Sequence, residues 1–395
     1  MMIQRNIKLI KIDNFFAGLW PLSALVVVYF AQITHSYAVA MLVLSISGIA
    51  RTIFEIPTGV WSDKIGRKKT LIYSGVSVFL ACFLWALAGE FNAVWMLFMG
   101  SIFWGLSDAM LSGPQDALMY ETMEELGEKD NYDILYSKAG YWNQAGLALA
   151  SVSAAIITYF YSLQTLAWIS VFPLFGSLIV AFLYVEPKRT KEQPRHTSLQ
   201  HFVIAFKELW RNKRARFYAV LDMLDESIGM STHRFESVYY DTLVASWLVN
   251  IARLVKQIAG MASFWIVPYV KKINAVQLLF TSMIGGTIFR MIGLIINTGV
   301  SPFLISLVNL FYGTSNTASS KILQTEFTTH QRATMASIVS FFGGIFMAIM
   351  MWLFGYVADI LGSRDTLFIA LGVKILIIIS ALTILKRKKK HQIVG

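Results

Sequence analysis

Three acidic side chains stand close together in a segment of membrane-spanning length. Asp222, Asp225 and Glu226 open this segment, and His233 and Glu236 follow further along it. A charged side chain at the centre of a bilayer costs about 2.5–3.5 kcal/mol on insertion scales. Three acids facing lipid would therefore cost roughly 8–10 kcal/mol, as much as the stability of a whole fold. These side chains must face water or cations.

The spacing of these residues places them on one side of a helix. One polar stripe follows from steps of three or four residues, through Asp222, Asp225 or Glu226, Gly229, His233 and Glu236. We expect this stripe to line a central aqueous cavity. Acids in such a cavity can bind protons near neutral pH, and a histidine can relay them. The alternative is that some of the acids form fixed ion pairs that hold helices together.

Neighbouring apolar segments supply the complementary cations. Arg253, Lys256 and Arg290 each lie inside such a segment. Lys374 lies near a helix end, where it either meets the acids or extends its ammonium to the interface. Asp108 is a lone acid in an earlier segment. The residues expected to line the cavity or carry protons are Asp108, Asp222, Asp225, Glu226, His233, Arg253, Lys256, Arg290, Trp104 and Tyr312.

The composition indicates that membrane helices position these residues. The chain has 395 residues, of which 56% are hydrophobic, and a mean hydropathy of +0.58, whereas soluble domains are about 45–50% apolar. The net charge of +11 comes from cations clustered beside apolar segments, which argues against nucleic acid as a partner. The one cysteine, Cys82, can form no intramolecular disulfide.

Twelve apolar stretches approach the roughly 20 residues that a bilayer requires. They are 15–33, 38–60, 71–88, 94–113, 139–160, 164–185, 217–240, 246–270, 276–297, 302–323, 333–358 and 366–385. The predicted fold is an all-α membrane protein with twelve transmembrane helices in two six-helix bundles related by pseudo-two-fold symmetry. The predicted domains are a bundle at 1–185, a linker at 186–216, and a second bundle with a basic tail at 217–395.

The loops indicate the orientation. Lysines and arginines concentrate on the face that holds the N-terminus, with Arg364 as the clear exception, so both termini are expected in the cytoplasm. Apolar residues recur at helical spacing between Leu199 and Trp210, which predicts an amphipathic helix in the linker. The tail from Lys386 to Lys390 is expected to contact anionic lipid headgroups.

An internal repeat supports two related halves. The hexapeptide 103–108, FWGLSD, is similar to 311–316, FYGTSN, at an offset of 208 residues. The same offset brings Asp63 and Lys64 onto Lys271 and Lys272. Chance similarity between aromatic-rich helices is the alternative, but two separate landmarks agree. Duplicated halves are typical of carriers that move around a site near the bilayer midplane.

A short polar loop separates the second and third predicted spans. It runs from 59 to 69 as GVWSDKIGRKK, and we call it the signature loop. An ordinary basic stop beside a helix would explain the cations, but not the two glycines and the acid at fixed offsets. The pattern resembles the loop between the second and third helices of major facilitator superfamily transporters. The similarity extends over the chain through helix number and the central linker.

The resemblance implies a conformational latch. In that family the loop acid touches the start of the eleventh helix in the outward-open state, and Asp63 would take this part. A helix N-terminus attracts an anion, which fits such a contact. Arg67 would then meet an acid at the end of the fourth span. The residues expected to form the latch are Gly59, Asp63, Lys64, Gly66, Arg67, Lys68, Asp116 and Glu121.

Two departures from the family pattern argue against one of the activities found in the family. The arginine common in the fourth helix of proton-driven drug exporters would fall at Ser101. The fifth predicted span lacks the proline of the antiporter motif. Both differences argue against a drug antiporter.

These observations predict secondary active transport of a small polar or zwitterionic organic solute by alternating access, coupled to protons or another ion. Export of amphiphilic drugs or metabolites is the second hypothesis, and a membrane sensor or membrane-embedded enzyme is the third. No G-x-x-x-x-G-K-[ST] loop and no His/Cys cluster occurs, so we expect no cofactor, no metal and no enzyme activity. The expected protein is monomeric, in the bacterial inner (plasma) membrane.

Overall fold

The computed structural model describes residues 3–187, 210, 213–270, 272–326 and 332–393, and every regular element in that part of the chain is a helix. The chain divides into two compact units. The first unit comprises Met1–Glu192 with Ala245–Leu254, and the second comprises Gln193–Val244 with Val255–Gly395. The predicted domain boundaries at 185 and 216 remain predictions, and the predicted linker helix lies outside the described residues.

The first unit begins with a broken span. The helix α1 (Arg5–Gly18) is followed by a short 3-10 helix η1 (Pro21–Ala24) and by α2 (Val26–Thr34). A residue before proline is disfavoured in the helical region, and Trp20, which precedes Pro21, has a non-helical ψ of 89°. The proline therefore accounts for the break in the first span.

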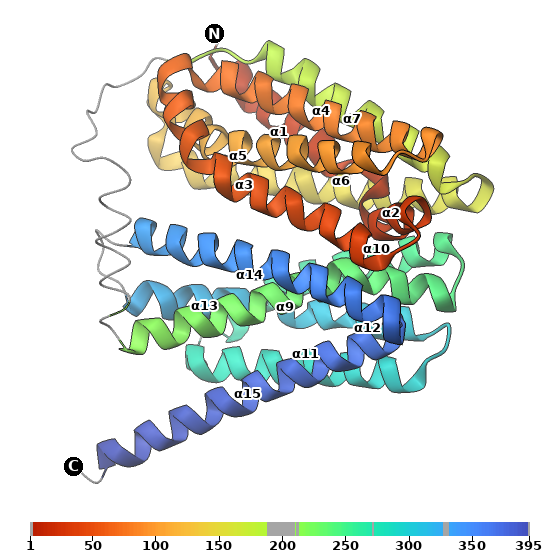
Figure 1. Cartoon of the computed structure of the whole chain (residues 1–395). Coiled ribbons are helices and arrows are strands. Elements are labelled where there is room, and N and C mark those ends of the chain that lie inside the picture. The colour runs from red at the N-terminus through yellow and green to blue at the C-terminus, as the bar shows by residue number, and fades with distance from the viewer. Residues whose placement is uncertain (1–2, 188–209, 211–212, 271, 327–331, 394–395) are drawn as a thin grey trace. The chain divides into compact units, whose positions relative to one another are not determined.

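The rest of the first unit consists of long helices. They are α3 (Tyr37–Ile65), α4 (Arg67–Phe91), α5 (Val94–Glu125), α6 (Tyr132–Phe160) and α7 (Leu163–Leu183), with η2 (Lys129–Asn131) between α5 and α6. Within this unit α1 packs on α6 and α7, while α4 packs on α5 and α7 (Figure 1). Gly18 and Gly146 allow the backbones of α1 and α6 to touch, because a Cβ on either glycine would overlap the other helix.

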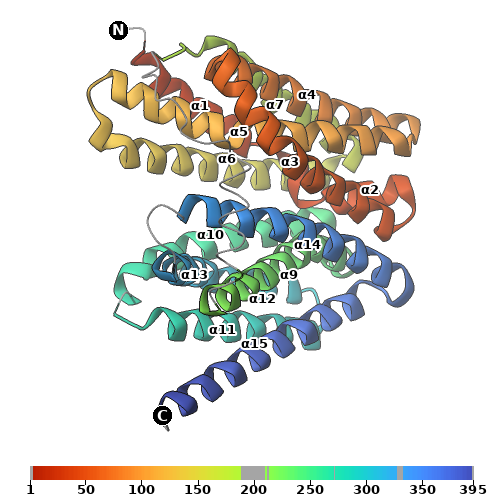
Figure 2. The same cartoon turned by 60° about the vertical axis from the view of Figure 1, so that its left-hand side comes forward.

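A second set of helices follows, all in the second unit except for the first nine residues of α10, which belong to the first unit. They are α9 (Lys213–Leu243), α10 (Ser246–Val270), α11 (Ala275–Ile296), α12 (Ser301–Ser306), η3 (Leu307–Phe311), α13 (Tyr312–Glu326), α14 (Arg332–Leu361) and α15 (Ser363–Ile393). Here α9 packs on α14 and α15, while α11 packs on α13 and α15 (Figure 2). The helix pairs therefore follow the same order in each unit, counted from its first span.

Local contacts near the repeat positions are similar. Ser74 on α4 hydrogen-bonds to Ser107 on α5 with their hydroxyl oxygens 3.0 Å apart. Ser282 on α11, at the offset of 208 from Ser74, hydrogen-bonds to Thr314 on α13 at 2.8 Å, one residue before the position that matches Ser107. Gly313 donates its N–H to the Ser263 hydroxyl at 2.8 Å, where α10 and α13 meet. These parallels support the predicted duplication, while the pseudo-two-fold symmetry remains a prediction.

Eight helices of the described chain are long and apolar enough to cross a membrane. The other four predicted spans differ for physical reasons. The first and tenth are interrupted by η1 and η3, so neither is one continuous helix. The seventh and eighth, α9 and α10, carry ionisable residues in their interiors. The protein is an integral membrane protein, and the count of twelve spans remains a prediction.

Candidate functional site

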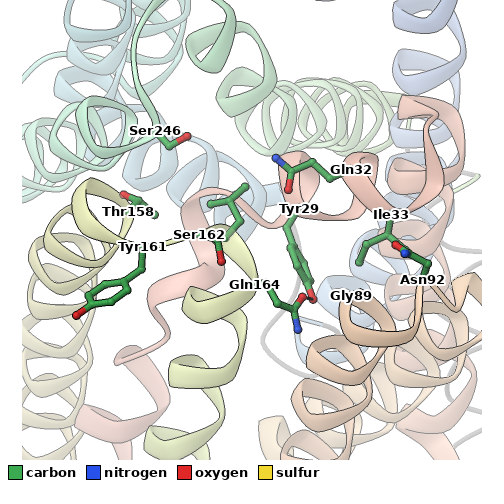
Figure 3. A pocket seen from close by; sticks show the side chains of 11 residues that line it. Tyr29, Gln32, Ile33, Gly89, Asn92, Thr158, Tyr161, Ser162, Gln164 and Ser246 are labelled. Carbon is green, nitrogen blue, oxygen red and sulfur yellow. Dashed lines mark hydrogen bonds between the residues drawn. The ribbon is translucent and has the colours of Figure 1, made fainter.

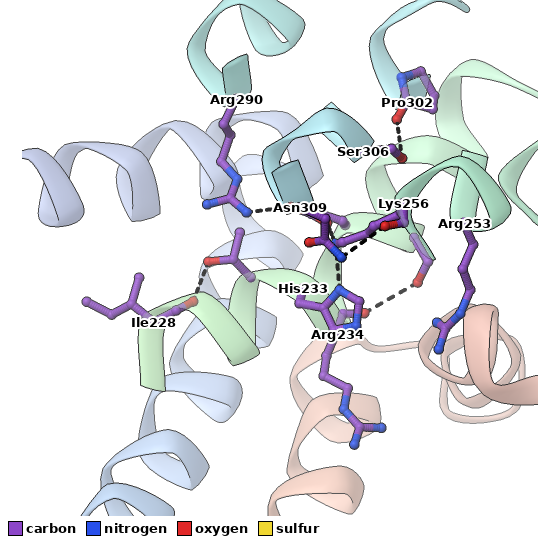
Figure 4. Close-up of polar contacts among 12 residues, drawn as sticks. Ile228, His233, Arg234, Arg253, Lys256, Arg290, Pro302, Ser306 and Asn309 are labelled. Carbon is purple, nitrogen blue, oxygen red and sulfur yellow. Dashed lines mark hydrogen bonds and ion pairs between the residues drawn. The ribbon is translucent and has the colours of Figure 1, made fainter. Parts of the chain in front are cut away.

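One buried carboxylate lies between two cations in the second unit. Glu236 on α9 accepts a hydrogen bond from Lys256 of α10 at 2.5 Å and another from Arg290 of α11 at 2.7 Å. The three side chains are at most 7% exposed. Hydrogen bonds between charged groups are the strongest type in proteins. We call these residues, together with His233, the charge cluster (Figure 4).

His233 completes the cluster beside Lys256. Its Nδ1 lies 2.5 Å from Lys256 Nζ. A charged ammonium group can only donate, so Nδ1 of the histidine accepts, and its other ring nitrogen carries the proton. Asn309 donates to the backbone carbonyl of Lys256 at 3.2 Å. The lysine is therefore held by two neighbouring side chains as well as by its ion pair.

The cluster responds strongly to any change of charge. Removing one member of a buried ion pair costs about 3–5 kcal/mol, because the remaining charge has neither water nor a partner. Protonation of Glu236 would weaken both of its ion pairs. An anionic ligand beside Lys256 or Arg290 would compete for the same cations. The arrangement can therefore exchange partners with a proton or with a charged solute.

The other acids of α9 contact different helices. Asp222 accepts a hydrogen bond from the Ser319 hydroxyl of α13. Asp225 forms an ion pair with Lys374 of α15 at 2.8 Å. Glu226 is exposed. Lys374 was expected either to meet an acid or to extend to the interface, and the structure shows the ion pair. That Asp222, Asp225 and Glu226 line a cavity remains a prediction.

The remaining cavity candidates lie in varied surroundings. Arg253 donates to the Ser23 carbonyl at 3.2 Å, and both residues belong to the first unit. Asp108 is half-buried on α5. Trp104 packs in an aromatic group, with ring centroids 4.4 Å from Trp20 and 5.1 Å from Trp85. In the second unit, Tyr312 is 50% exposed beside Phe264.

The signature loop turns sharply at a glycine. Gly66 has a φ of +109°, which L side chains rarely adopt, and it ends α3 and begins α4. A Cβ at this position would also lie 2.8 Å from the Glu186 Oε1 atom. The conformation therefore requires glycine, and a side chain there would also displace the Glu186 carboxylate. Gly59 has open space around its Cα, and no comparable constraint applies there.

Arg67 connects the loop to α5. Its guanidinium lies 2.7 Å from the Asp63 carboxylate and 3.1 Å from the Glu121 carboxylate. Of the two acids expected at the end of the fourth span, Glu121 therefore meets the arginine, whereas Asp116 is exposed. Lys64 is exposed too. The side chains at the start of α14 lie outside the described residues, so the latch itself remains a prediction.

Glu186 stabilises the start of α4. Its carboxylate accepts the backbone N–H groups of Arg67 and Lys68, each at 2.7 Å. The first N–H groups of a helix have no partner within the helix, and an acid there also meets the positive end of the helix dipole. Next to it, Asn6 of α1 exchanges two hydrogen bonds with the Val185 backbone, at 2.8 and 2.9 Å. These bonds join α1, α4 and α7.

A separate cavity lies at one end of the first unit. It has a volume of about 400 Å³ and uncharged lining (Figure 3). Its lining residues are Tyr29, Gln32, Ile33, Gly89, Asn92, Thr158, Tyr161, Ser162, Leu163, Gln164 and Ser246. The Tyr29 hydroxyl already donates to Gln164 at 2.8 Å. The cavity offers amide and hydroxyl groups rather than charges.

Sequence patterns identified Lys256 and Arg290 as complementary cations but not that both meet Glu236, and they missed the roles of two further acids. Glu236 is prominent in the sequence as part of the polar stripe, but its central position depends on α10 and α11. Glu186 lies in the stretch assigned to the linker, and Asp13 lies just before the first predicted span. The polar gap after residue 185 was a usable signal for Glu186. It is expected at the same membrane face as the start of the third span, where the first N–H groups of the helix need an acceptor. For Asp13 the sequence held no comparable signal.

The fold and these charges define a membrane transporter. Long apolar helices, two helical units, buried ionisable groups and a basic turn with a required glycine occur together in this chain. The family model of the Major Facilitator Superfamily matches residues 14–345, so the chain belongs to this superfamily. The family consists of transporters rather than enzymes, and its members carry small molecules.

Known proteins similar to this chain are also transporters. The inner membrane transport protein YajR of Escherichia coli is 29% identical over 133 residues, which cover 34% of this chain and 27% of that protein. Two other transporters similar to this chain are each matched over 54% of their own length, so the chain spans about half of each.

Two solved structures share the fold. The nucleoside transporter NupG has a TM-score of 0.79 at 16% identity, with 98% of this chain and 100% of that chain covered. A D-xylose-proton symporter has a TM-score of 0.69 at 12% identity, with 97% of each chain covered. At these identities the likeness concerns the fold alone.

Proposed function

We propose that the protein is a secondary active transporter that moves a small polar or zwitterionic organic solute by alternating access, driven by a proton gradient. The observation that carries this proposal is the charge cluster, in which one buried carboxylate is shared by two buried cations. A buried group that binds a proton or exchanges ion-pair partners is the device by which a gradient can be coupled to movement.

The cluster suggests how solute and proton act on each other. A carboxylate of the solute would take over Lys256 or Arg290, and Glu236 would then lose part of its stabilisation. A proton on Glu236 would remove the charge that has lost its partner. Binding of the solute and binding of the proton would therefore favour each other, which is the linkage that symport requires. A zwitterion fits because the site offers both signs of charge.

Further acids extend the proposed proton pathway. Asp108, Asp222, Asp225 and Glu226 are candidates for proton binding, with His233 as a relay. Trp104 and Tyr312 would wall the cavity, and Arg253 would add a third cation. The names of the two similar structures, a nucleoside transporter and a D-xylose-proton symporter, support a polar solute and proton coupling.

The remaining parts of the proposal concern the membrane. The chain would span the bacterial inner membrane twelve times as a monomer, with both termini in the cytoplasm. The distribution of lysine and arginine supports this orientation, and the inner-membrane location of YajR supports the compartment. The signature loop would latch the two halves through Asp63, and the basic tail would contact anionic headgroups.

The experiment uses purified protein in liposomes with an imposed pH gradient. A panel of amino acids, nucleosides, sugars and amphiphilic dyes would be offered, and accumulation would be measured. We expect gradient-dependent accumulation of a polar or zwitterionic solute. Acid variants should lower it at least about tenfold, equivalent to about 1.4 kcal/mol. They are Asp108→Asn, Asp222→Asn, Asp225→Asn and Glu226→Gln.

Asp130→Asn is the matched control, because Asp130 is an exposed acid in η2. This variant should transport like the wild type. If all four acid variants also match the wild type and keep its pH dependence, these acids do not couple transport to protons. Accumulation of dyes alone would favour the exporter hypothesis, and binding without flux would favour a sensor.

A further inference from the structure

A buried acid in the first unit belongs neither to the charge cluster nor to the signature loop. Asp13 of α1 is 4% exposed. Its Oδ1 accepts a hydrogen bond from the Ser177 hydroxyl at 2.5 Å, and its Oδ2 accepts one from the Tyr184 hydroxyl at 2.8 Å. Ser177 lies on α7 and Tyr184 is its C-terminal cap residue. Each oxygen of the carboxylate thus has one hydroxyl donor, and both donors come from the same end of α7.

An apolar core adjoins Asp13 through Tyr184. Helices α1, α4, α5, α6 and α7 contribute to this core, which includes Ile10, Ala139 and Val180. The titratable group that faces Asp13 from α7 is Tyr184. From α6, the polar contact to this part of α1 is the neutral side chain of Asn143, which donates to the Asn14 carbonyl.

No cation forms an ion pair with Asp13 among the residues that the structure describes. On α1 itself, Lys11 is two residues away and therefore points to the opposite side of the helix. An ionised carboxylate without a cation is costly to bury, and two hydroxyl donors offset only part of that cost. Asp13 thus differs from Glu236, whose charge is matched by two cations.

We propose that Asp13 is a second proton-binding site, located between α1 and α7, which takes up and releases a proton during the transport cycle. The proposal rests on the proposed function, because it assumes that the helices move during transport. In the ionised form both hydroxyl groups donate to the carboxylate. In the neutral form the proton sits on one carboxyl oxygen and is itself donated, so one hydroxyl partner must turn round.

The architecture of α1 allows the required movement. This helix ends at Gly18 and is joined to α2 through η1, so its 14 residues can tilt without carrying α2 along. Short connections of this kind are where hinge motion is absorbed. A tilt away from α7 would separate Asp13 from both donors and open it to water. Asn6, which bonds to Thr122 and to the Val185 backbone, would be released by the same movement.

Infrared titration of the purified protein tests the site without transport. A buried carboxylic acid gives a resolved C=O band in difference spectra between acidic and alkaline pH. We expect this band in the wild type and in the Asp130→Asn control, and its loss in Asp13→Asn. The variant Tyr184→Phe removes one donor to the ionised form, so its midpoint should move to higher pH. A band unchanged in Asp13→Asn, or a midpoint unchanged in Tyr184→Phe, would overturn the proposal.

Transport assays test whether the proton moves. Asp13→Asn should retain solute exchange at equal pH on both sides, because substrate binding lies elsewhere. It should lower accumulation driven by a pH gradient at least about tenfold. Full accumulation in Asp13→Asn would contradict the proposal. If the wild type shows no gradient-driven accumulation at all, the proposed function fails, and the infrared result still reports on Asp13 separately.

Discussion

At the scale of single residues, the balance of buried charge distinguishes the two units. In the second unit one acid is shared by two cations, Lys256 and Arg290, each within 2.7 Å of Glu236. In the first unit the partners of Asp13 among the described residues are two hydroxyl groups. Buried ion pairs add little stability relative to apolar packing, but breaking one is expensive. This asymmetry is consistent with the proposed exchange of partners in the cluster.

Breaking a buried ion pair in the charge cluster should cost more stability than removing one of two cations. Thermal unfolding in detergent would measure this difference. Glu236→Gln leaves two buried cations without their shared acid and should lower stability by about 3–5 kcal/mol. Lys256→Met leaves the Glu236–Arg290 pair intact, so its effect should be smaller. The double variant should recover part of the loss, because one uncompensated cation replaces two. Equal effects of the two single variants, with additive losses in the double variant, would contradict the pairing.

Sequence reasoning identified these acids and cations but not which of them pair with one another. The cost of charge in a bilayer was enough to single out Asp222, Asp225 and Arg290, since it depends only on residue type and segment length. Partner choice depends on which faces of α9, α10 and α11 meet. That information is spread over packing contacts far apart in the chain. Asp13 was missed because it precedes the first hydrophobic stretch and contacts residues more than 160 positions away.

At the scale of elements, helix ends and breaks place the functional groups. The turn at Gly66 brings Arg67 between Asp63 and Glu121, and Glu186 fixes the first turn of α4. The break at Pro21 separates α1 from α2. The turn at Gly66 and the Glu186 contact lie at helix ends, and the break at Pro21 lies inside the first span. They are suited to controlling the movement of whole helices.

The signature loop should affect the rate of movement more than the affinity for solute. Asp63→Ala removes one of the two acids that hold Arg67 and the acid proposed to latch the halves. We expect kcat to fall about tenfold, which corresponds to about 1.4 kcal/mol, while KM stays within about twofold. Initial rates of uptake into liposomes measure both constants, with exposed Asp130→Asn as the control. A raised KM with an unchanged kcat would argue against a latch.

Hydrophobic patterns predicted the helices well but not their interruptions. Apolar length alone placed α4, α7 and α11 within a few residues of their ends, because a bilayer-spanning helix needs little else. The break in the first span has a visible cause in Pro21. The 3-10 stretch Leu307–Phe311 in the tenth span contains no proline, so its sequence carries no warning. Tertiary packing decides the local geometry there.

At the scale of the whole molecule, the two units use similar internal construction. The first helix of each unit packs on the fifth and sixth spans of that unit, and a hydroxyl pair joins the third and fourth spans in both units. Duplicated halves with buried ionisable groups suit a carrier that alternates access to one site. The six residues around Trp104 and Tyr312 suggested the repeat, and in both copies the glycine, Gly105 or Gly313, packs closely against the backbone of a neighbouring helix.

Proton coupling is the central claim, and one measurement tests it directly. Purified protein is placed in liposomes that contain a pH-sensitive dye, with equal pH on both sides, and a transported solute is added outside. Solute movement should change the lumen pH in step with the flux, and a protonophore should abolish the pH change. Solute flux of the same size with a constant lumen pH would contradict proton coupling.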